Sequence, residues 1–195
     1  MDECRITGVV LAGGLGRRMG SIDKGLQSLH QRPMVEWVIE RLAPQVDELL
    51  INANQHVERY AAFGHPVVPD RIPGCAGPLA GLHAALASAR HPLVATAPCD
   101  SPFLPRDLVA RLLQALRTAD AELAVARTFD QPHPVFCLCR QTVLPHLNAF
   151  LSGGGRRFER WYSTLNVVEV AFDDEAAAFT NINTREELAR FDAAG

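Results

Sequence analysis

The chain has 195 residues, of which 48% are hydrophobic and 21% are charged, and its formal net charge is −3. This composition is typical of one folded domain with a sizeable core, so we expect a single domain over residues 1–195 and not a disordered or fibrous chain. A surface that binds nucleic acid is usually strongly basic, and the net charge argues against nucleic acid as a ligand.

The first residues lack the pattern of a secretory signal. Asp2, Glu3 and Arg5 precede only a short apolar run, Gly8 to Leu11. No stretch approaches the roughly 20 apolar residues of a membrane span. The sequence therefore predicts a cytoplasmic protein with no membrane segment, and we expect a monomer because no exposed helical seam indicates an obligate dimer.

Strand-length apolar runs alternate with stretches of helical period. The predicted strands are Ile6 to Leu11, Glu48 to Asn52, Pro66 to Val68, Pro92 to Ala97, Leu123 to Ala126, Val135 to Cys139 and Val167 to Phe172. Most lack polar alternation, as expected for strands that are covered on both faces. This order predicts an α/β fold with three layers, in which helices cover both faces of a mostly parallel, twisted sheet.

Helices are predicted where apolar residues recur at intervals of three and four. The sets are Val35, Val38, Ile39 and Leu42, with Pro33 in the first turn; Leu79, Leu82 and Leu86; and Leu108, Val109, Leu112, Leu113 and Leu116, preceded by Pro105. Thr184 and Glu187 form a capping-box pattern at the start of a last helix, which is expected to bury Leu188 and Phe191.

The five cysteines, at positions 4, 75, 99, 137 and 139, are expected to be reduced thiols in the core. Their number is odd, and they form neither a C-x-x-C pair nor a zinc spacing with histidine. Cys137 and Cys139 would lie on one face of a strand, which favours packing over metal binding.

Two segments have a chemically distinctive composition. Gly153 to Gly155 precede Arg156, Arg157 and Arg160, and two interpretations are equally open: a mobile loop over a site, or a turn between helices with a solvated charged face. The seven histidines show no metal-binding spacing, so a structural or substrate-loop role is expected for His133.

The strongest functional signal follows the first strand, where Leu11-Ala-Gly-Gly-Leu-Gly-Arg-Arg-Met-Gly20 leads to Asp23-Lys24-Gly25. Glycines let backbone N–H groups approach phosphate oxygens, and Arg17, Arg18 and Lys24 supply positive charge. The spacing fails the P-loop pattern and misses the dinucleotide fingerprint by one residue. The loop therefore predicts a nucleotide site of another kind, the alternative being a glycine-rich turn with incidental basic residues.

Acidic residues follow two later strands. Asp100 comes at the end of the apolar run that begins at Leu93, where an open α/β sheet places its ligand site. Mg²⁺ needs only one or two protein carboxylates, because water and phosphate oxygens complete its octahedron. We therefore predict Asp100 as the Mg²⁺ ligand, the alternative being a helix N-cap or turn residue. Asp70 either binds nucleotide or caps a turn ahead of Arg71.

These motifs resemble the nucleotide-binding signature of nucleotidyltransferases, most closely that of the molybdenum cofactor guanylyltransferase family. The similarity continues through Asn52-Ala53-Asn54, Asp70, Gly77 to Gly81, Pro98-Cys99-Asp100 with Pro102, His133-Pro134, and Asn181-Ile182-Asn183-Thr184 with Glu187. It spans nearly the whole chain and implies a Rossmann-like nucleotidyltransferase fold.

The resemblance implies Mg²⁺-dependent transfer of GMP from GTP to the terminal phosphate of molybdopterin. It also implies transient contacts with molybdoenzymes or other proteins of the cofactor pathway. The nucleotide contacts expected from it are Leu11, Ala12, Gly13, Gly14, Lys24, Asn52, Asp70 and Asp100, and the expected catalytic residues are Arg18, Lys24 and Asp100.

Neighbouring asparagines are interpreted in two ways. Asn52 and Asn54 alternate faces of an extended chain, so we expect only one of them to point into a given pocket. Asn181 and Asn183, with Arg156, lie toward the second substrate by the resemblance, and the alternative is turn chemistry.

Two other kinds of function stay open. A cytidylyltransferase of the same pathway, or a nucleotidyltransferase for a sugar phosphate, would use a similar loop. The second glycine of Leu-Ala-Gly-Gly favours the guanylyl branch, since cytidylyl relatives more often have Leu-Ala-Ala-Gly. A non-catalytic nucleotide-sensing module would share the fold, but the presence of both Lys24 and Asp100 argues against it.

Overall fold

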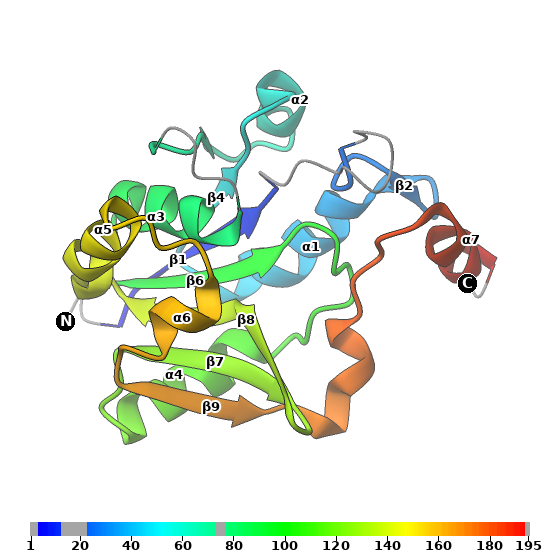
Figure 1. Cartoon of the computed structure of the whole chain (residues 1–195). Helices are drawn as coiled ribbons and strands as arrows, with labels where there is room; N and C mark the ends of the chain where they lie inside the picture. Colours follow the sequence, from blue (N-terminus) through cyan, green and yellow to red (C-terminus); the bar gives the residue numbers. More distant parts are fainter. Residues whose placement is uncertain (1–3, 13–22, 73–76, 194–195) are drawn as a thin grey trace.

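The structure is a computed structural model that describes residues 4–12, 23–72 and 77–193. A seven-stranded sheet forms its centre, in the order β5-β4-β1-β6-β8-β7-β9 (Figure 1). The strands are β1 (Ile6–Leu11), β4 (Glu48–Asn52), β5 (Val67–Val68), β6 (Leu93–Pro98), β7 (Leu123–Thr128), β8 (Gln131–Arg140) and β9 (Val167–Ala171). All neighbours pair in parallel except β8, which is antiparallel to β6 and β7. The mostly parallel sheet predicted from the sequence is confirmed.

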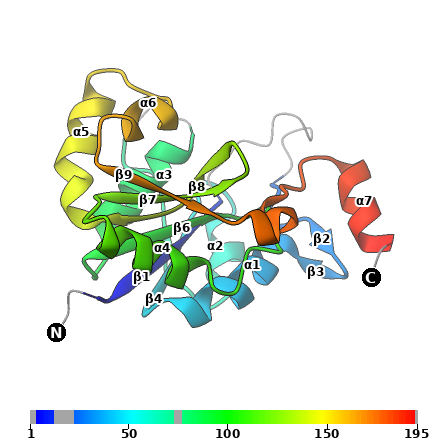
Figure 2. The same ribbon diagram turned by 90° about the horizontal axis from the view of Figure 1, so that it is seen from below.

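Helices lie on both faces of this sheet, as Figure 2 shows from below. The helices are α1 (Met34–Leu42), α2 (Val57–Ala61), α3 (Pro78–Ser88), α4 (Leu108–Thr118), α5 (Leu144–Ser152), α6 (Phe158–Tyr162) and α7 (Arg185–Ala193), and there are 3-10 turns at Ala43–Gln45, Gln141–Val143 and Asp173–Phe179. Side chains of α1 and α4 pack in one apolar cluster, and those of α3, α5 and α6 pack in another. The predicted three layers are therefore present.

The strands bury side chains on both faces, which explains why they lack polar alternation. Along β1, Val10 belongs to the cluster with α1 and α4, and Val9 belongs to the cluster with α3 and α5. Each such buried aliphatic side chain contributes roughly 1.5–3 kcal/mol to stability. Cys137 and Cys139 share the α3 and α5 face and are buried free thiols, as predicted.

The other cysteines differ from one another. Cys99 is buried and free, as expected, whereas Cys4 is an exposed free thiol, so its predicted place in the core was wrong. Cys4 precedes β1, outside the run of apolar residues that enters the sheet. Cys75 lies outside the described residues.

The predicted boundaries of β8 were wrong, because this strand begins at Gln131 and not at Val135. Pro132 and Pro134 argue against a strand, since proline cannot donate to a ladder. In this part β8 pairs only with β7, because the pairing with β6 begins at Cys137. The prolines therefore lie where β8 has a strand on one side only, and such positions tolerate them.

A two-stranded hairpin, β2 (Ser28–Leu29) with β3 (Arg32–Pro33), was not predicted. His30 and Gln31 form its turn with φ of 49° and 64°. A two-residue turn with positive φ at both positions normally carries Asn or Gly, so the sequence has no hairpin signal here. Pro33 precedes α1 as its N-cap residue and does not lie in the first turn.

The last helix, α7, begins with the predicted capping box. Thr184 Oγ1 accepts from Glu187 N at 3.1 Å, and Glu187 Oε2 accepts from Thr184 N at 3.1 Å. Leu188 and Phe191 are only partly buried, contrary to expectation. The reason is that α7 packs beside the small β2–β3 hairpin and not on the main sheet (Figure 1).

Two other sequence predictions concern the surface. Gly153 to Gly155 connect α5 to α6, which is the geometry of a turn between helices, and the mobility of this segment stays a prediction. Within residues 4–12, 23–72 and 77–193, no helix is both long enough and apolar enough to cross a membrane.

Candidate active site

The candidate site lies at the carboxyl ends of three adjacent strands. Leu11, the last residue of β1, is in register with Asn52 of β4 on one side and with Pro98 of β6 on the other. Parallel strands that end together leave a crevice in which open α/β sheets bind ligands. A cavity of about 230 Å³ lies here.

Six residues predicted to contact nucleotide line this one cavity: Leu11, Ala12, Lys24, Asn52, Asp70 and Asp100. They come from five separate parts of the chain and converge because the strands place their carboxyl ends side by side. The remaining predicted residues, Gly13, Gly14 and Arg18, lie outside the described residues, as does Arg17. The structure thus brings together all the predicted nucleotide contacts that it describes.

Asn52 and Asn54 both contact Asp70, but of the two only Asn52 lines the cavity, as expected. Asn52 Nδ2 donates to Asp70 Oδ1 at 2.9 Å, and Asn54 Nδ2 donates to Asp70 Oδ2 at 2.8 Å. Strand β4 ends at Asn52, so the alternation of an extended chain no longer applies at Asn54. Asp70 N in turn donates to Asn54 Oδ1 at 2.8 Å, which fixes the loop after β5.

Helix α3 approaches this asparagine closely. A side chain at Gly81 would place its Cβ 2.5 Å from Asn52 Oδ1 and 2.9 Å from Leu11 Cδ2. Only glycine permits this contact, so the Gly77 to Gly81 motif serves to bring α3 against the ends of β1 and β4. Helix α3 begins at Pro78, after Gly77, and both residues line the cavity.

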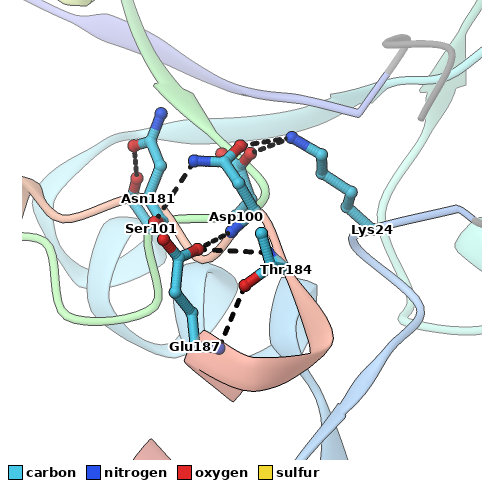
Figure 3. A network of polar contacts seen from close by, with 7 residues as sticks. Lys24, Asp100, Ser101, Asn181, Thr184 and Glu187 are labelled. Atoms are coloured by element: carbon cyan, nitrogen blue, oxygen red, sulfur yellow. Dashed lines mark hydrogen bonds and ion pairs between the residues drawn. The ribbon is translucent and has the colours of Figure 1, made fainter. Parts of the chain in front are cut away.

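Lys24 and Asp100 form an ion pair in the cavity, with 3.1 Å between Lys24 Nζ and Asp100 Oδ2 (Figure 3). Their side chains are 24% and 12% exposed, so the pair is largely shielded from water. Lys24 is the only lysine in the chain. Its Nζ also donates to Asn183 Oδ1 at 2.5 Å. One ammonium group therefore connects the segment after β1, the turn after β6 and the C-terminal segment.

The C-terminal segment is held against the turn that contains Asp100. Ile182 N donates to the Asp100 carbonyl oxygen at 2.9 Å. Ser101 Oγ donates to Asn181 Oδ1 at 2.6 Å (Figure 3). Asp100 is not a helix N-cap, because α4 begins at Leu108 with Asp107 before it. Asp100 lies in a turn after β6, which was the alternative interpretation of this residue in the sequence. It also lines the cavity, as its predicted role as a Mg²⁺ ligand requires.

The position of Lys24 depends on its neighbours Asp23 and Gly25. The hydroxyl group of Tyr60 donates to Asp23 Oδ1 at 2.5 Å, and Tyr60 is fully buried. A Cβ at Gly25 would lie 2.6 Å from the Tyr60 hydroxyl oxygen and 3.2 Å from Cys99 Sγ. The chain on both sides of Lys24 is therefore packed tightly onto Tyr60 and Cys99.

Burial keeps the Tyr60 hydroxyl and the Cys99 thiol protonated at neutral pH. It raises the pKa of the Tyr60 hydroxyl, with smaller contributions from Cys99 and from the hydrogen bond to Asp23. It also raises the pKa of the Cys99 thiol, and the neighbouring carboxylates of Asp100 and Asp23 act in the same direction. At neutral pH Cys99 is a protonated packing residue and not a nucleophile.

We expect Tyr60→Phe to lower the free energy of unfolding by about 1–2 kcal/mol, because it leaves the Asp23 carboxylate without its buried donor. Urea unfolding measures this change. Tyr162→Phe is the matched control, since among the described residues the Tyr162 hydroxyl has no hydrogen-bond partner. Equal effects of the two substitutions would show that the Asp23 contact does not stabilise the fold.

The donor set around Asp100 fits Mg²⁺. Asp100 Oδ2 accepts from Lys24, and no donor among the described residues contacts Oδ1. In that part of the chain, no group of three or more His, Cys, Asp or Glu side chains is placed to hold a metal ion. Mg²⁺ does not require such a cage, because substrate phosphates and water supply most of its ligands. A single carboxylate oxygen that faces a nucleotide cavity is therefore compatible with this ion.

The three residues considered for the second substrate do not share one cavity. Asn181 and Asn183 line a second cavity, and Asn181 also lines the first one. Arg156 lines a third cavity together with Arg157 and Arg160. Its guanidinium donates to the carbonyl oxygens of Leu151 and Gly155, which form the end of α5 and the following turn.

Several cavity residues were missed as site residues in the sequence. Asp23 and Cys99 stood inside recognised motifs, and their position beside Lys24 and Asp100 was a usable signal. Val135 lines both the first and second cavities, and Tyr60 acts through Asp23. Nothing in the local sequence of Tyr60 or Val135 marks these roles, because both depend on tertiary packing.

Comparison with known proteins identifies the family. The model of the MobA-like NTP transferase domain matches residues 8–167. The chain belongs to the MobA-like NTP transferase family. The match includes the positions of Gly13, Gly14 and Arg18, and it confirms the nucleotidyltransferase resemblance.

Individual MobA-like relatives are similar over nearly their whole length. A protein of Cupriavidus taiwanensis named molybdenum cofactor guanylyltransferase is 53% identical, over 96% of this chain and 96% of the relative. A protein of the same name from Cupriavidus necator is 54% identical, over 94% of each chain. The crystal structure of molybdopterin-guanine dinucleotide biosynthesis protein A from Archaeoglobus fulgidus superposes with a TM-score of 0.82 at 25% identity, covering 96% of this chain and 97% of that one.

Family membership makes the chain a nucleotidyltransferase, and the structure has the sheet of its solved MobA-like relative. The Rossmann-like fold expected from the sequence is therefore confirmed. The site is typical of a nucleotidyltransferase, because the ammonium group of Lys24 and the carboxylate of Asp100 lie in one cavity at the ends of parallel strands. Gly81 lets helix α3 approach these strand ends closely.

Proposed function

We propose that the chain transfers GMP from GTP to the terminal phosphate of molybdopterin, forming molybdopterin guanine dinucleotide and releasing pyrophosphate. The observation that carries this proposal is the pairing of Lys24 with Asp100, 3.1 Å apart, in the cavity at the ends of β1, β4 and β6. The choice of GTP and molybdopterin is supported by the relatives at 53% and 54% identity, which are named molybdenum cofactor guanylyltransferases. The relatives thus favour the guanylyl branch over a cytidylyltransferase or a sugar-phosphate enzyme.

Asp100 is the proposed ligand of Mg²⁺. When it is bound, this ion supplies positive charge that stabilises the transferring phosphoryl group. Asp100 is held for this role by two contacts: its side chain pairs with Lys24, and its carbonyl oxygen accepts from Ile182 N. Both contacts limit the movement of the carboxylate, which favours a fixed position for the nucleotide phosphates.

Lys24 is the proposed cation for the departing pyrophosphate. Its ammonium group has three hydrogens, of which two are directed to Asp100 and Asn183. Arg18, with the backbone of Gly13 and Gly14, is proposed to contribute further positive charge and N–H donors to the same phosphates. Leu11, Ala12, Asn52 and Asp70 would then contact the rest of the nucleotide.

No general base is required in this reaction. The terminal phosphate of the acceptor is already ionised at neutral pH, and it attacks the α-phosphate of GTP directly. The protonated thiol of Cys99 cannot compete as a nucleophile. Catalysis then consists of positioning and of stabilising charge, and both depend on groups that are fixed before the substrate binds.

A thermal-shift comparison of GTP, CTP, UTP and ATP, each with Mg²⁺, tests the choice of nucleotide. A ligand that binds only the folded state raises its stability, by about 2.7 kcal/mol at a hundred times Kd. We expect the largest increase in Tm with GTP. A larger increase with CTP or UTP at equal concentrations would contradict the guanylyl assignment and favour a related enzyme.

A further inference from the structure

Tyr60 is a buried polar residue to which the proposed mechanism gives no part. Its side chain is fully buried in the apolar cluster that includes side chains of α1 and α4, and its hydroxyl group donates to Asp23 Oδ1 at 2.5 Å. Burial is the main cause that raises the pKa of this hydroxyl, so Tyr60 keeps its proton at neutral pH. The residue is therefore a permanent hydrogen-bond donor to the Asp23 carboxylate.

Helix α2 presents Tyr60 from a closed loop between β4 and β5. Asn54 and Asp70 join the two ends of this loop, because Asn54 Nδ2 donates to Asp70 Oδ2 and Asp70 N donates to Asn54 Oδ1, each at 2.8 Å. Within the loop, Phe63 packs beside the Tyr60 ring, with 6.5 Å between the ring centroids. These contacts limit where the Tyr60 hydroxyl can lie.

The hydroxyl group reaches Asp23 past Gly25. A Cβ at Gly25 would lie 2.6 Å from the Tyr60 hydroxyl oxygen, so any larger residue would displace it. The backbone beside it is held separately: Gln27 Nε2 donates to the Asp23 carbonyl oxygen at 3.2 Å, and Gln27 N donates to the Lys24 carbonyl oxygen at 3.0 Å. The turn thus fixes the backbone of Asp23 and Lys24, and the hydroxyl fixes the carboxylate.

The nucleotide cavity holds one ammonium group and several carboxylates. Asp23, Lys24 and Asp100 all line it, and Lys24 is the only Lys or Arg among its described lining residues. Lys24 Nζ pairs with Asp100 at 3.1 Å (Figure 3), whereas the described residues include no ion pair between Lys24 and Asp23. Opposite charges attract more strongly where water is scarce. The Tyr60 hydroxyl is the described donor that holds the Asp23 carboxylate against this attraction.

We propose that Tyr60 is a positioning residue for the transfer reaction, because its hydroxyl holds the Asp23 carboxylate off the ammonium group of Lys24. Lys24 is then left to Asp100 and the departing pyrophosphate. The inference rests on the proposed function, since it takes Lys24 to be the cation that stabilises this leaving group. Without the hydroxyl, the Asp23 carboxylate loses its buried donor and turns to the adjacent Lys24.

The alternative is that Tyr60 only stabilises the fold, and Thr7 offers a matched control for that role. Thr7 is fully buried, and its Oγ1 donates to Glu48 Oε2 at 2.9 Å. The two residues are in register near the amino ends of β1 and β4, whereas the cavity lies at the carboxyl ends. Thr7→Val therefore removes a buried hydroxyl from a carboxylate without touching the contacts of Lys24.

The first test measures kcat and KM for GTP in pyrophosphate release, at a temperature at which every variant is folded. We expect Tyr60→Phe to lower kcat about tenfold, on the scale of losing one hydrogen bond to a charged group, with a smaller effect on KM. In the Asp23→Asn background the same substitution is expected to have no further effect, because a carboxamide does not compete for Lys24. Thr7→Val is expected to keep the wild-type kcat and KM.

The second test needs neither GTP nor acceptor, because Lys24 is the only lysine of the chain. An amine-selective reagent reacts with the neutral amine, and a second carboxylate beside Lys24 stabilises the unreactive ammonium form. We therefore expect Lys24 to be labelled more slowly in Tyr60→Phe than in the wild type. The double variant Tyr60→Phe/Asp23→Asn is expected to be labelled at the rate of Asp23→Asn alone, and Thr7→Val at the wild-type rate.

Three results would overturn the inference: an unchanged kcat in Tyr60→Phe, an equal loss of kcat from this substitution in the Asp23→Asn background or from Thr7→Val, or an unchanged rate of labelling in Tyr60→Phe. Failure of the proposed function is a separate outcome. If the wild type transfers no GMP, that function fails, while the labelling rates still decide whether Tyr60 controls the contacts of Lys24.

Discussion

Replacement of Asp100 by alanine is expected to lower the rate of GMP transfer by a factor on the order of a hundred or more, the usual scale for loss of one electrostatic stabiliser. The substitution removes the proposed Mg²⁺ ligand and leaves Lys24 without its carboxylate partner at 3.1 Å. The measurement is the steady-state rate of pyrophosphate release at saturating GTP and acceptor, with Mg²⁺ present. A near wild-type rate would remove Asp100 from the mechanism.

Two further variants make this result specific. Asp100→Asn keeps the size of the side chain and removes its charge, so a loss as large as that of Asp100→Ala would assign the effect to charge. Asp120→Asn is the control, because Asp120 is 95% exposed and pairs with Arg140 at the surface. A surface pair of this kind contributes little to stability, and we expect this variant to keep its activity. An equal loss in Asp120→Asn would show that the assay reports a general effect of lost charge.

Lys24→Ala is the second substitution with a large expected effect, again on the order of a hundredfold in rate. It removes the ammonium group that connects Asp100 and Asn183 and that we propose to neutralise the departing pyrophosphate. The measurement separates kcat from KM for GTP. An unchanged rate at saturating GTP would confine Lys24 to binding.

The conservative and control variants refine the role of Lys24. Lys24→Arg keeps the charge, but its planar guanidinium cannot reproduce the compact ammonium between two acceptors, so we expect only partial activity. Arg59→Ala, on the short helix α2, is a control for the loss of a cation elsewhere.

Because Lys24 is the only lysine, an amine-selective reagent followed by mass spectrometry reports on it directly. Bound GTP is expected to protect Lys24 from this reagent, and equal labelling with and without GTP would contradict a contact with phosphate.

The predictable part of this protein consists of the features that local sequence determines. Unbroken apolar runs identified the parallel strands, and the ends of those runs located Leu11, Asn52 and Asp100 in one cavity. This works because parallel strands end at a common edge, where polar residues are free to meet a ligand. The capping box at Thr184 was predictable for a similar reason, since its two hydrogen bonds join residues three positions apart.

The unpredicted part depends on contacts between distant segments. The early start of β8 reflects which strands pair beside Pro132, and the shared contact of Asn52 and Asn54 with Asp70 reflects where β4 ends. The support of Asp23 by Tyr60 joins residues 37 positions apart. No periodicity or motif carries such information, because each contact forms only when separate elements pack together.

The most direct test of the proposed GMP transfer is the reaction of the purified chain with molybdopterin, Mg²⁺ and GTP that is labelled at the α-phosphate. We expect the label to enter a molybdopterin dinucleotide, pyrophosphate to form in an equal amount, and CTP labelled in the same way to give no comparable product. Transfer from CTP in place of GTP would contradict the guanylyl assignment, and tight binding of GTP without release of pyrophosphate would contradict the transfer reaction itself.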